Sequence, residues 1–461
     1  MRSRTFFSRV RSTGKTTVGL ALLLALCAGL VQAGCGGDGN GTAETRSGTI
    51  PQPAVDDPRV APESRRVDLE VPTFSNPTEV TNSLFPVSKQ ESVLLLGQVD
   101  GEPFRTEVTL LPETRIIEWE GQRVEVLVSQ YVAFLSGRLH EVAYDFYAQD
   151  DSGAVWYFGE DVFNFRDGVI VDTHGTWIAS KDGPAAMIMP ADPQVGQVYR
   201  PENIPGFVFE EVTVKAVDKT LQGPLGPVEG GLEIRELHLL DSARETKTFG
   251  PGYGEFLTGG AGDVEAISLA VPTDRLDGPT PAELEALAAG AERIYGAGQL
   301  GSSAKGTIAR MGDAWKTVQA GQVPDNIEPL MSASLRRLRR AVDAGEQAKA
   351  SQAAIDVAQS AYDLQLRHRP ATEVDFARFQ LWLAQLGLDA KAGDPALVNG
   401  DFFTIDYLRD RIQHTIAEPD RVEVNTLLEE LNGAVGDEDL GAAAETAQQL
   451  RDLTAGIQQA G

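Results

Sequence analysis

The sequence predicts an α+β protein in which an antiparallel β-meander is followed by a separate α-helical bundle domain. Apolar and polar residues alternate with a period of two over residues 71–274, as in the strands of a curved sheet, a half-barrel or a barrel. Residues 280–461 are instead rich in Ala, Leu, Gln and charged residues, and their apolar residues recur at helical spacing. Pro279 and Pro281 lie between the two patterns, which places the domain boundary there.

The first 34 residues have the plan of an export signal. Five basic residues and no acidic residue precede or flank an apolar run from about Val18 to Val31. This run is too short to span a bilayer, which needs about 20 residues. Residues 35–70 consist mainly of Gly, Asp, Thr, Ser and Pro, a composition that buries too little apolar surface to fold, so we expect a disordered tether.

The end of this first segment, Gln32-Ala33-Gly34-Cys35, resembles the lipobox of bacterial lipoproteins. In that family the signal is cut just before the cysteine, whose thiol is then acylated. The resemblance implies that Cys35 is the lipid attachment site and that the protein is anchored on the extracytoplasmic side of the cell membrane. The alternative is an ordinary secreted protein in which Cys35 is incidental. Cys27 is the only other cysteine and would leave with the signal, so we expect no disulfide.

The charge balance excludes one class of partner. The chain has 40 Lys and Arg against 67 Asp and Glu, and loss of the five basic residues of the signal would take the net charge from −27 to −32. Such a surface repels the phosphates of nucleic acids. We therefore expect no nucleic acid as a partner, and contact with the membrane through the lipid anchor alone.

Tight turns divide the β region into short strands. Glycine follows a polar residue at five places between runs rich in Val, Ile, Tyr and Phe, and this pairing favours two-residue hairpin turns. The five pairs are Asp100-Gly101, Glu120-Gly121, Ser136-Gly137, Ser152-Gly153 and Asp167-Gly168. A second block predicts strands near Phe207–Val217, Val228–Leu240, Glu245–Phe249 and Val264–Leu269.

The helical region begins with an N-terminal signature. Thr280-Pro281-Ala282-Glu283 combines a capping residue, a proline at the first helical position and an acid in the first turn. Apolar residues then recur at steps of three and four, for example at Met331, Leu335, Leu338 and Val342. The pattern predicts seven or eight helices in an antiparallel bundle, and a helical solenoid is the alternative.

A series of short motifs carries a second resemblance. They are Asn76-Pro77-Thr78-Glu79-Val80-Thr81-Asn82, Tyr147-Ala148-Gln149-Asp150, Val155-Trp156-Tyr157-Phe158-Gly159-Glu160-Asp161, Gly175-Thr176-Trp177, Met189-Pro190-Ala191 and Pro251-Gly252-Tyr253-Gly254. In order and spacing, residues 74–270 resemble an uncharacterised family of exported bacterial proteins that is common in actinobacteria. The resemblance implies export and an all-β domain, and it brings no activity with it.

One hairpin carries aromatic residues on both faces. Alternation along a strand places Trp156 and Phe158 on one side and Tyr157 on the other, and Tyr147 comes from the preceding strand. A hairpin with one solvated face would alternate more cleanly, so something must cover the second face. We consider a core with a domain interface, or a groove for an apolar ligand. In the second case Trp156, Phe158 and Tyr147 are the candidate ligand-binding residues.

No pattern in the sequence predicts a catalytic residue, a metal site or a cofactor. The sequence has no G-x-S-x-G nucleophile motif. No two of the five histidines have the spacing of metal ligands on one helix. They are His140, His174, His238, His368 and His414.

These observations favour a lipid-anchored envelope protein that acts as a non-catalytic binding or interaction module. We expect an apolar small molecule or an envelope protein as its ligand. Two alternatives stay open. One is a hydrolase whose site lies between the domains and combines acids of the hairpins with His or Arg of the helices. The other is metal handling by the helical domain through His368 and His414.

Overall fold

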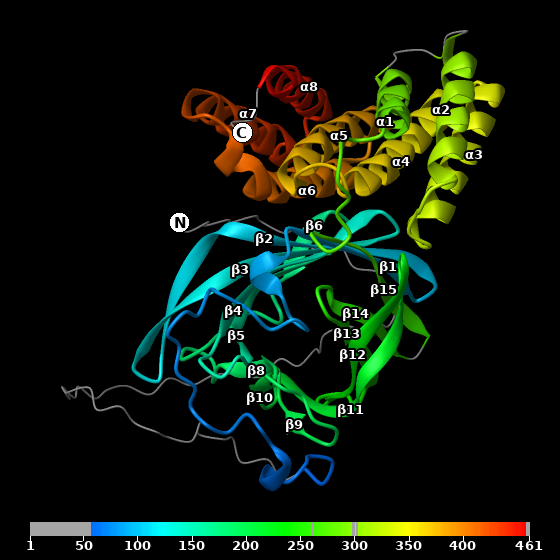
Figure 1. Ribbon diagram of the computed structural model, residues 1–461. Coiled ribbons are helices and arrows are strands. Elements are labelled where there is room, and N and C mark those ends of the chain that lie inside the picture. Colours follow the sequence, from blue (N-terminus) through cyan, green and yellow to red (C-terminus); the bar gives the residue numbers. More distant parts are fainter. Residues whose placement is uncertain (1–56, 261, 297–299, 301–302, 458–461) are drawn as a thin grey trace.

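A computed structural model describes residues 57–260, 262–296, 300 and 303–457. It contains a single large antiparallel sheet of 15 strands followed by eight α-helices, which confirms the predicted α+β class (Figure 1). The export signal, Cys35 and most of the expected tether lie outside the described residues. None of the helices in the described part of the chain is long and apolar enough to cross a membrane.

The sheet is formed by residues 92–271. Its strands are β1 (Ser92–Val99), β2 (Glu102–Trp119), β3 (Gln122–Leu135), β4 (Arg138–Gln149), β5 (Val155–Arg166), β6 (Val169–Asp172), β7 (Trp177–Ile178), β8 (Ala186–Met189), β9 (Val198–Tyr199), β10 (Asn203–Ile204), β11 (Val208–Gly223), β12 (Gly226–His238), β13 (Arg244–Gly250), β14 (Gly254–Gly260) and β15 (Asp263–Val271). The helices are α1 (Ala282–Tyr295), α2 (Ser303–Gln319), α3 (Ile327–Ala344), α4 (Gln347–Gln365), α5 (Ala371–Ala392), α6 (Pro395–Ile412), α7 (Glu418–Gly436) and α8 (Leu440–Gly456).

The strands form a meander that curls around an interior (Figure 1). Their order is β10-β11-β12-β13-β14-β15-β1-β2-β3-β4-β5-β6, with β7 and β8 on β5 and β9 on β11. Most neighbours are therefore joined by short hairpins. The pairing of β15 with β1 is the exception, because it joins the two blocks of strands and so produces one continuous curved sheet.

Four of the five predicted turns close these hairpins, whereas Ser152-Gly153 lies in the longer loop between β4 and β5, where Gly153 but not Ser152 has positive φ. At Asp100-Gly101, Glu120-Gly121, Ser136-Gly137 and Asp167-Gly168 both residues have positive φ, which is the geometry of a two-residue turn that matches the twist of the strands. Gly168 is required for a second reason as well. A Cβ atom there would lie 1.8 Å from the backbone oxygen of Ala396 in α6, so the turn packs directly against that helix.

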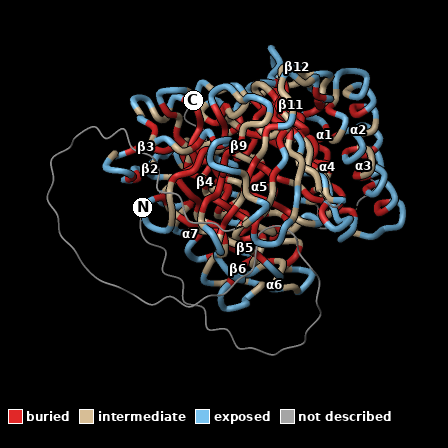
Figure 2. The backbone as a smooth tube through the Cα atoms, turned by 90° about the horizontal axis from the view of Figure 1, so that it is seen from below, coloured by how far each residue is buried: buried red, intermediate tan, exposed pale blue. Residues whose placement is uncertain are grey.

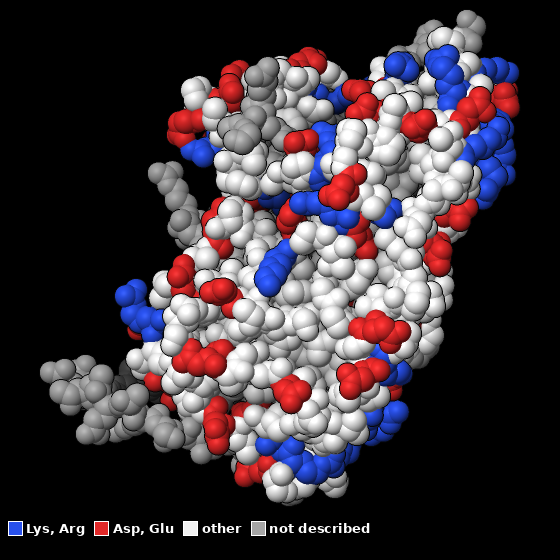
Figure 3. Space-filling view, viewed as in Figure 1, with Lys and Arg blue, Asp and Glu red and all other residues white. Residues whose placement is uncertain are grey.

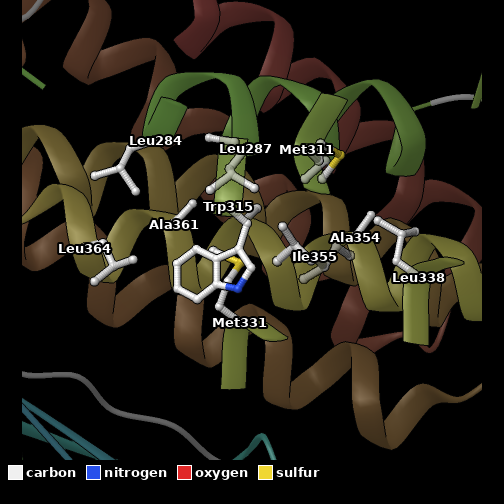
Figure 4. Packing of buried hydrophobic residues seen from close by; sticks show 14 of the residues in the cluster. Leu284, Leu287, Met311, Trp315, Met331, Leu338, Ala354, Ile355, Ala361 and Leu364 are labelled. Carbon is white, nitrogen blue, oxygen red and sulfur yellow. The ribbon is translucent and has the colours of Figure 1, made fainter. Parts of the chain in front are cut away.

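The helices cover one part of the outer face of the sheet, near β1, β2 and β6 (Figure 1). Leu94 and Leu96 of β1 and Leu269 and Val271 of β15 belong to the same hydrophobic cluster as residues of α1 to α5. Figure 4 shows the helical part of this cluster around Trp315. This cluster is therefore shared by the sheet and the helices, while other buried clusters belong to one part alone. Buried segments run through both parts (Figure 2).

A buried network of ion pairs also joins the two parts. Glu107 of β2 accepts from Arg411 of α6 at 2.7 Å, and Nη1 of Arg378 in α5 lies 3.7 Å from the same carboxylate. Arg378 is also 2.7 Å from Asp363 and 2.9 Å from Asp375. All five side chains are at most 7% exposed. Although burial opposes ionisation, the surrounding guanidinium groups lower the pKa values of Glu107 and Asp363.

Candidate ligand-binding cavity

The curled sheet encloses a cavity of about 290 Å³. On several strands, alternate residues line it, as the period of two predicts. Along β4 these residues are Glu141, Ala143, Asp145 and Tyr147. Along β1, Val93 and Leu95 line the cavity, whereas Leu94 and Leu96 face the helices. At β1 the sheet thus packs against helices with its outer face and lines the cavity with its inner face.

Acidic residues dominate the polar part of the lining. Among the described residues that line the cavity, nine are acidic, while Lys247 and His238 are the only basic side chains. The acids are Glu141, Asp145, Glu160, Glu202, Glu210, Glu236, Glu245, Glu255 and Glu265. On the face drawn in Figure 3, by contrast, acidic and basic side chains are interspersed. The lining of the cavity thus has an excess of negative groups of its own.

Asp145 and Glu160 form the centre of one wall. They are direct partners across the β4–β5 ladder, with exposed fractions of 9% and 7%. Burial raises the pKa of Asp145 to about 7. Burial also raises the pKa of Glu160 well above its usual range, and the charges of Glu202 and Asp145 add to this effect. Two negative charges side by side in a low-dielectric wall would repel each other, which favours the protonated forms of these carboxyl groups near neutral pH. A bound cation would favour their ionised forms instead.

Two stacked tyrosines lie next to these acids. The rings of Tyr147 and Tyr157 are 5.0 Å apart at 22°, and both line the cavity. The hydroxyl group of Tyr157 donates a hydrogen bond of 2.7 Å to Asp145. Aromatic faces next to carboxylates are the environment in which organic cations bind well.

The opposite wall contains the two basic groups. Nδ1 of His238 in β12 lies 2.6 Å from Glu210, and Nζ of Lys247 in β13 lies 2.6 Å from Glu236. Burial alone would lower the pKa of His238, but its close contact with the carboxylate of Glu210 and the nearby carboxylate of Glu245 raise it to about 11. Both basic groups are therefore paired with acids of their own wall. Neither His238 nor Lys247 serves as a counter-ion for the acids of β4 and β5.

The predicted ligand-binding residues are divided between two places. Tyr147 lines the cavity, but Trp156 and Phe158 are not part of its lining. Instead, both pack against Trp119, with ring centroids 6.1 Å and 5.9 Å apart. The indole nitrogen of Trp156 also donates to Asp150 at 2.8 Å. Trp156 and Phe158 thus belong to the buried core on the other side of β5 from the cavity.

The histidines singled out in the sequence do not come together as a metal site. Among the described residues, the one group with metal-ligand geometry is Glu236, His238 and Glu245, on β12 and β13. It does not include His368 or His414 of the helical domain. Between the domains, the acids and arginines that a hydrolase could use are engaged with one another in the ion-pair network.

Sequence reasoning missed most of the cavity residues. Glu236 and His238, like Glu245 and Lys247, are two residues apart, which places each pair on one face of its strand. This spacing was the available signal. The spacing does not reveal which face of the sheet is concave. These side chains converge because they lie on the concave face.

No protein-family model, no curated protein and no solved structure matches this chain.

Proposed function

We propose that this protein is a lipid-anchored binding protein of the cell envelope whose β domain binds a small organic cation with an apolar or aromatic body. The observation that carries the proposal is the excess of carboxyl groups in the cavity, nine against one lysine and one histidine in the described lining. The aromatic and aliphatic residues between them suit the apolar part of such a ligand. The expected apolar ligand is thereby refined to one that also carries a positive charge.

The energetic cost of this lining supports a functional role for it. Buried carboxyl groups that are not balanced by an equal number of basic groups destabilise a protein interior, and an apolar lining would stabilise the curled sheet more. A cation placed between Asp145 and Glu160 would form charge-assisted hydrogen bonds and relieve their repulsion. The stacked rings of Tyr147 and Tyr157 offer a π face beside it.

The first prediction is that Asp145→Asn combined with Glu160→Gln will stabilise the protein and abolish cation binding. The variant replaces two buried acids that face each other, and whose charged forms repel each other, but keeps the volume and the acceptor for Tyr157. We expect the free energy of unfolding to rise by about 1 kcal/mol, as relief of like-charge repulsion across a ladder typically gives. Affinity for 2-phenylethylammonium should fall at least about tenfold, because charge-assisted hydrogen bonds are lost.

Glu429→Gln on the exposed face of α7 is the matched control and should change neither quantity. Urea denaturation and calorimetric titration measure the two effects. A double variant that is less stable, or that binds the cation as well as the parent, would contradict a functional role for the pair.

The second prediction concerns pH. The folded-state pKa values of Asp145 and Glu141 are raised to about 7, in both cases mainly by burial. Between pH 4 and pH 7 the folded protein therefore binds more protons at these groups than the unfolded chain does. Its free energy of unfolding should rise by a few kcal/mol as the pH falls from 8 to 5, since one pKa unit corresponds to about 1.4 kcal/mol.

Below about pH 4 the trend should reverse, because Glu107 and Asp363 have lowered pKa values and lose their ion pairs on protonation. Urea denaturation at pH 5, 6, 7 and 8 measures the upper part of this profile. The Asp145→Asn, Glu160→Gln variant should show a flatter profile than the parent. Stability that falls steadily from pH 8 to pH 5 would rule out neutral carboxyl groups in the cavity.

The third prediction concerns the anchor. Replacing Cys35 with serine should prevent lipid attachment, because serine offers no thiol for acylation. The variant should then stay uncleaved or leave the cell, and fractionation with a mobility comparison on gels would show it. Cys27→Ser, which changes the other cysteine of the chain, is the control and should leave both unchanged. A Cys35→Ser protein that fractionates and migrates like the parent would show that the protein is not a lipoprotein of this kind.

A further inference from the structure

A second feature of the cavity lies on β12 and β13. Glu236 and Glu245 are direct partners across this ladder, and His238 follows Glu236 by two residues on the same face. Each of the three side chains offers one ligand atom, and these atoms lie within 4.8 Å of one another. Nε2 of His238 is 3.7 Å from Oε2 of Glu245, is buried and has no hydrogen-bond partner.

We propose that Glu236, His238 and Glu245 form a binding site for a divalent transition-metal ion of the Zn²⁺ or Mn²⁺ class. Imidazole and carboxylate donors suit such ions. Two donors that are each about 2.1 Å from a tetrahedral metal lie about 3.4 Å apart, close to the observed separation of Nε2 and Oε2. Small movements of the side chains would therefore be enough to accommodate the ion.

The second shell of the site supports this assignment. Nδ1 of His238 lies 2.6 Å from Oε1 of Glu210, its direct partner in the β11–β12 ladder. A carboxylate at this nitrogen fixes the orientation of the ring and directs Nε2 towards the metal, as in most metal-binding histidines.

A buried tyrosine gives an independent observation. Tyr199 of β9 pairs with Val212 of β11, and Val212 pairs with Glu236, so the three residues form one row across the sheet. The side chain of Tyr199 is 0% exposed and lines the cavity, yet its hydroxyl group has no hydrogen-bond partner. A water molecule or hydroxide bound to a metal in this row would supply the missing partner.

Lys247 competes with the proposed ion. Its ammonium group lies 2.6 Å from Oε2 of Glu236 and occupies the position of a counter-ion there. A metal ion that binds Glu236 must displace this contact. Removing the ammonium group by Lys247→Met should therefore raise metal affinity, which a purely structural ion pair would not predict.

This site goes beyond the proposed function and is tested separately from it. Zn²⁺ and Mn²⁺ are titrated into the purified, chelator-treated protein, with affinity measured by calorimetry and by competition with a chromophoric chelator. We expect one ion per molecule for at least one of the two metals. His238→Gln should abolish binding, Glu210→Gln should weaken it about 10–100-fold, and Lys247→Met should strengthen it.

Two controls separate this site from other sources of metal affinity. His414→Gln, at an exposed histidine of the helical domain, and Asp145→Asn with Glu160→Gln, in the other wall, should leave the metal affinity within about twofold of the parent. Circular dichroism and thermal melts establish that each variant is folded. Absence of binding by both the parent and Lys247→Met, or binding that His238→Gln leaves unchanged, would overturn the proposal. Failure of organic cations to bind would contradict only the proposed function.

Discussion

Replacing Arg378 with methionine should lower the free energy of unfolding by about 3–5 kcal/mol, the cost of removing one partner from a buried ion pair. The guanidinium group is 1% exposed and lies within 4 Å of Glu107, Asp363 and Asp375. Methionine fills a similar volume but leaves these carboxylates with less compensation. Because Glu107 belongs to the sheet and the other two acids to the helices, the loss should also weaken the contact between the two parts.

Urea denaturation followed by circular dichroism measures this change. Arg336→Met on α3 is the matched control, because that arginine is exposed and its loss should change stability by less than about 0.5 kcal/mol. Equal stability of the Arg378 and Arg336 variants would show that the network does not hold the sheet and helices together.

Replacing Trp156 with alanine should cost about 3–5 kcal/mol of stability, as truncation of a large buried aromatic typically does. The side chain is 2% exposed and packs against Trp119. Its loss also leaves Asp150 without the hydrogen bond from the indole nitrogen. Because Trp156 lies outside the cavity lining, the affinity of the folded fraction for an organic cation should stay within about twofold of the parent.

Thermal melts and calorimetric titration separate these two effects. Tyr147→Ala is the comparison from the opposite side of the hairpin, since Tyr147 lines the cavity and should be needed for binding. A Trp156 variant that keeps its stability but loses affinity would restore Trp156 as a binding residue and contradict the placement of the ligand in the cavity.

Local features of the fold could be predicted because their causes are local. The turn at Asp100-Gly101 needs two residues with positive φ, and the sequence supplies residues that adopt it readily. The predicted strands 207–217, 228–240 and 245–249 overlap β11, β12 and β13 for the same reason, since alternation and turn residues are both visible in a short window.

Long-range features had no such signal. The pairing of β1 with β15 joins residues such as Ser92 and Val271. The sequence of neither strand contains a signal that identifies the other as its partner. Arg411 and Glu107 are 304 residues apart in the sequence, so their ion pair could not be predicted from spacing. The sequence did show that both faces of the hairpin carry aromatic residues. It could not show that Tyr147 faces the concave side and Trp156 the core, because curvature depends on the whole sheet.

Isothermal titration calorimetry of the purified protein at pH 7 tests the central claim most directly. The ligands are 2-phenylethylammonium, its neutral analogue 2-phenylethanol and its anionic analogue phenylacetate, each in two buffers of different ionisation enthalpy. We predict that only the cation binds, at one site, and that protons are released on binding, because a cation lowers the pKa values of carboxyl groups such as Asp145 that titrate near pH 7. Equal binding of the three compounds, or binding of the cation without proton release, would contradict a cavity whose carboxyl groups recognise positive charge.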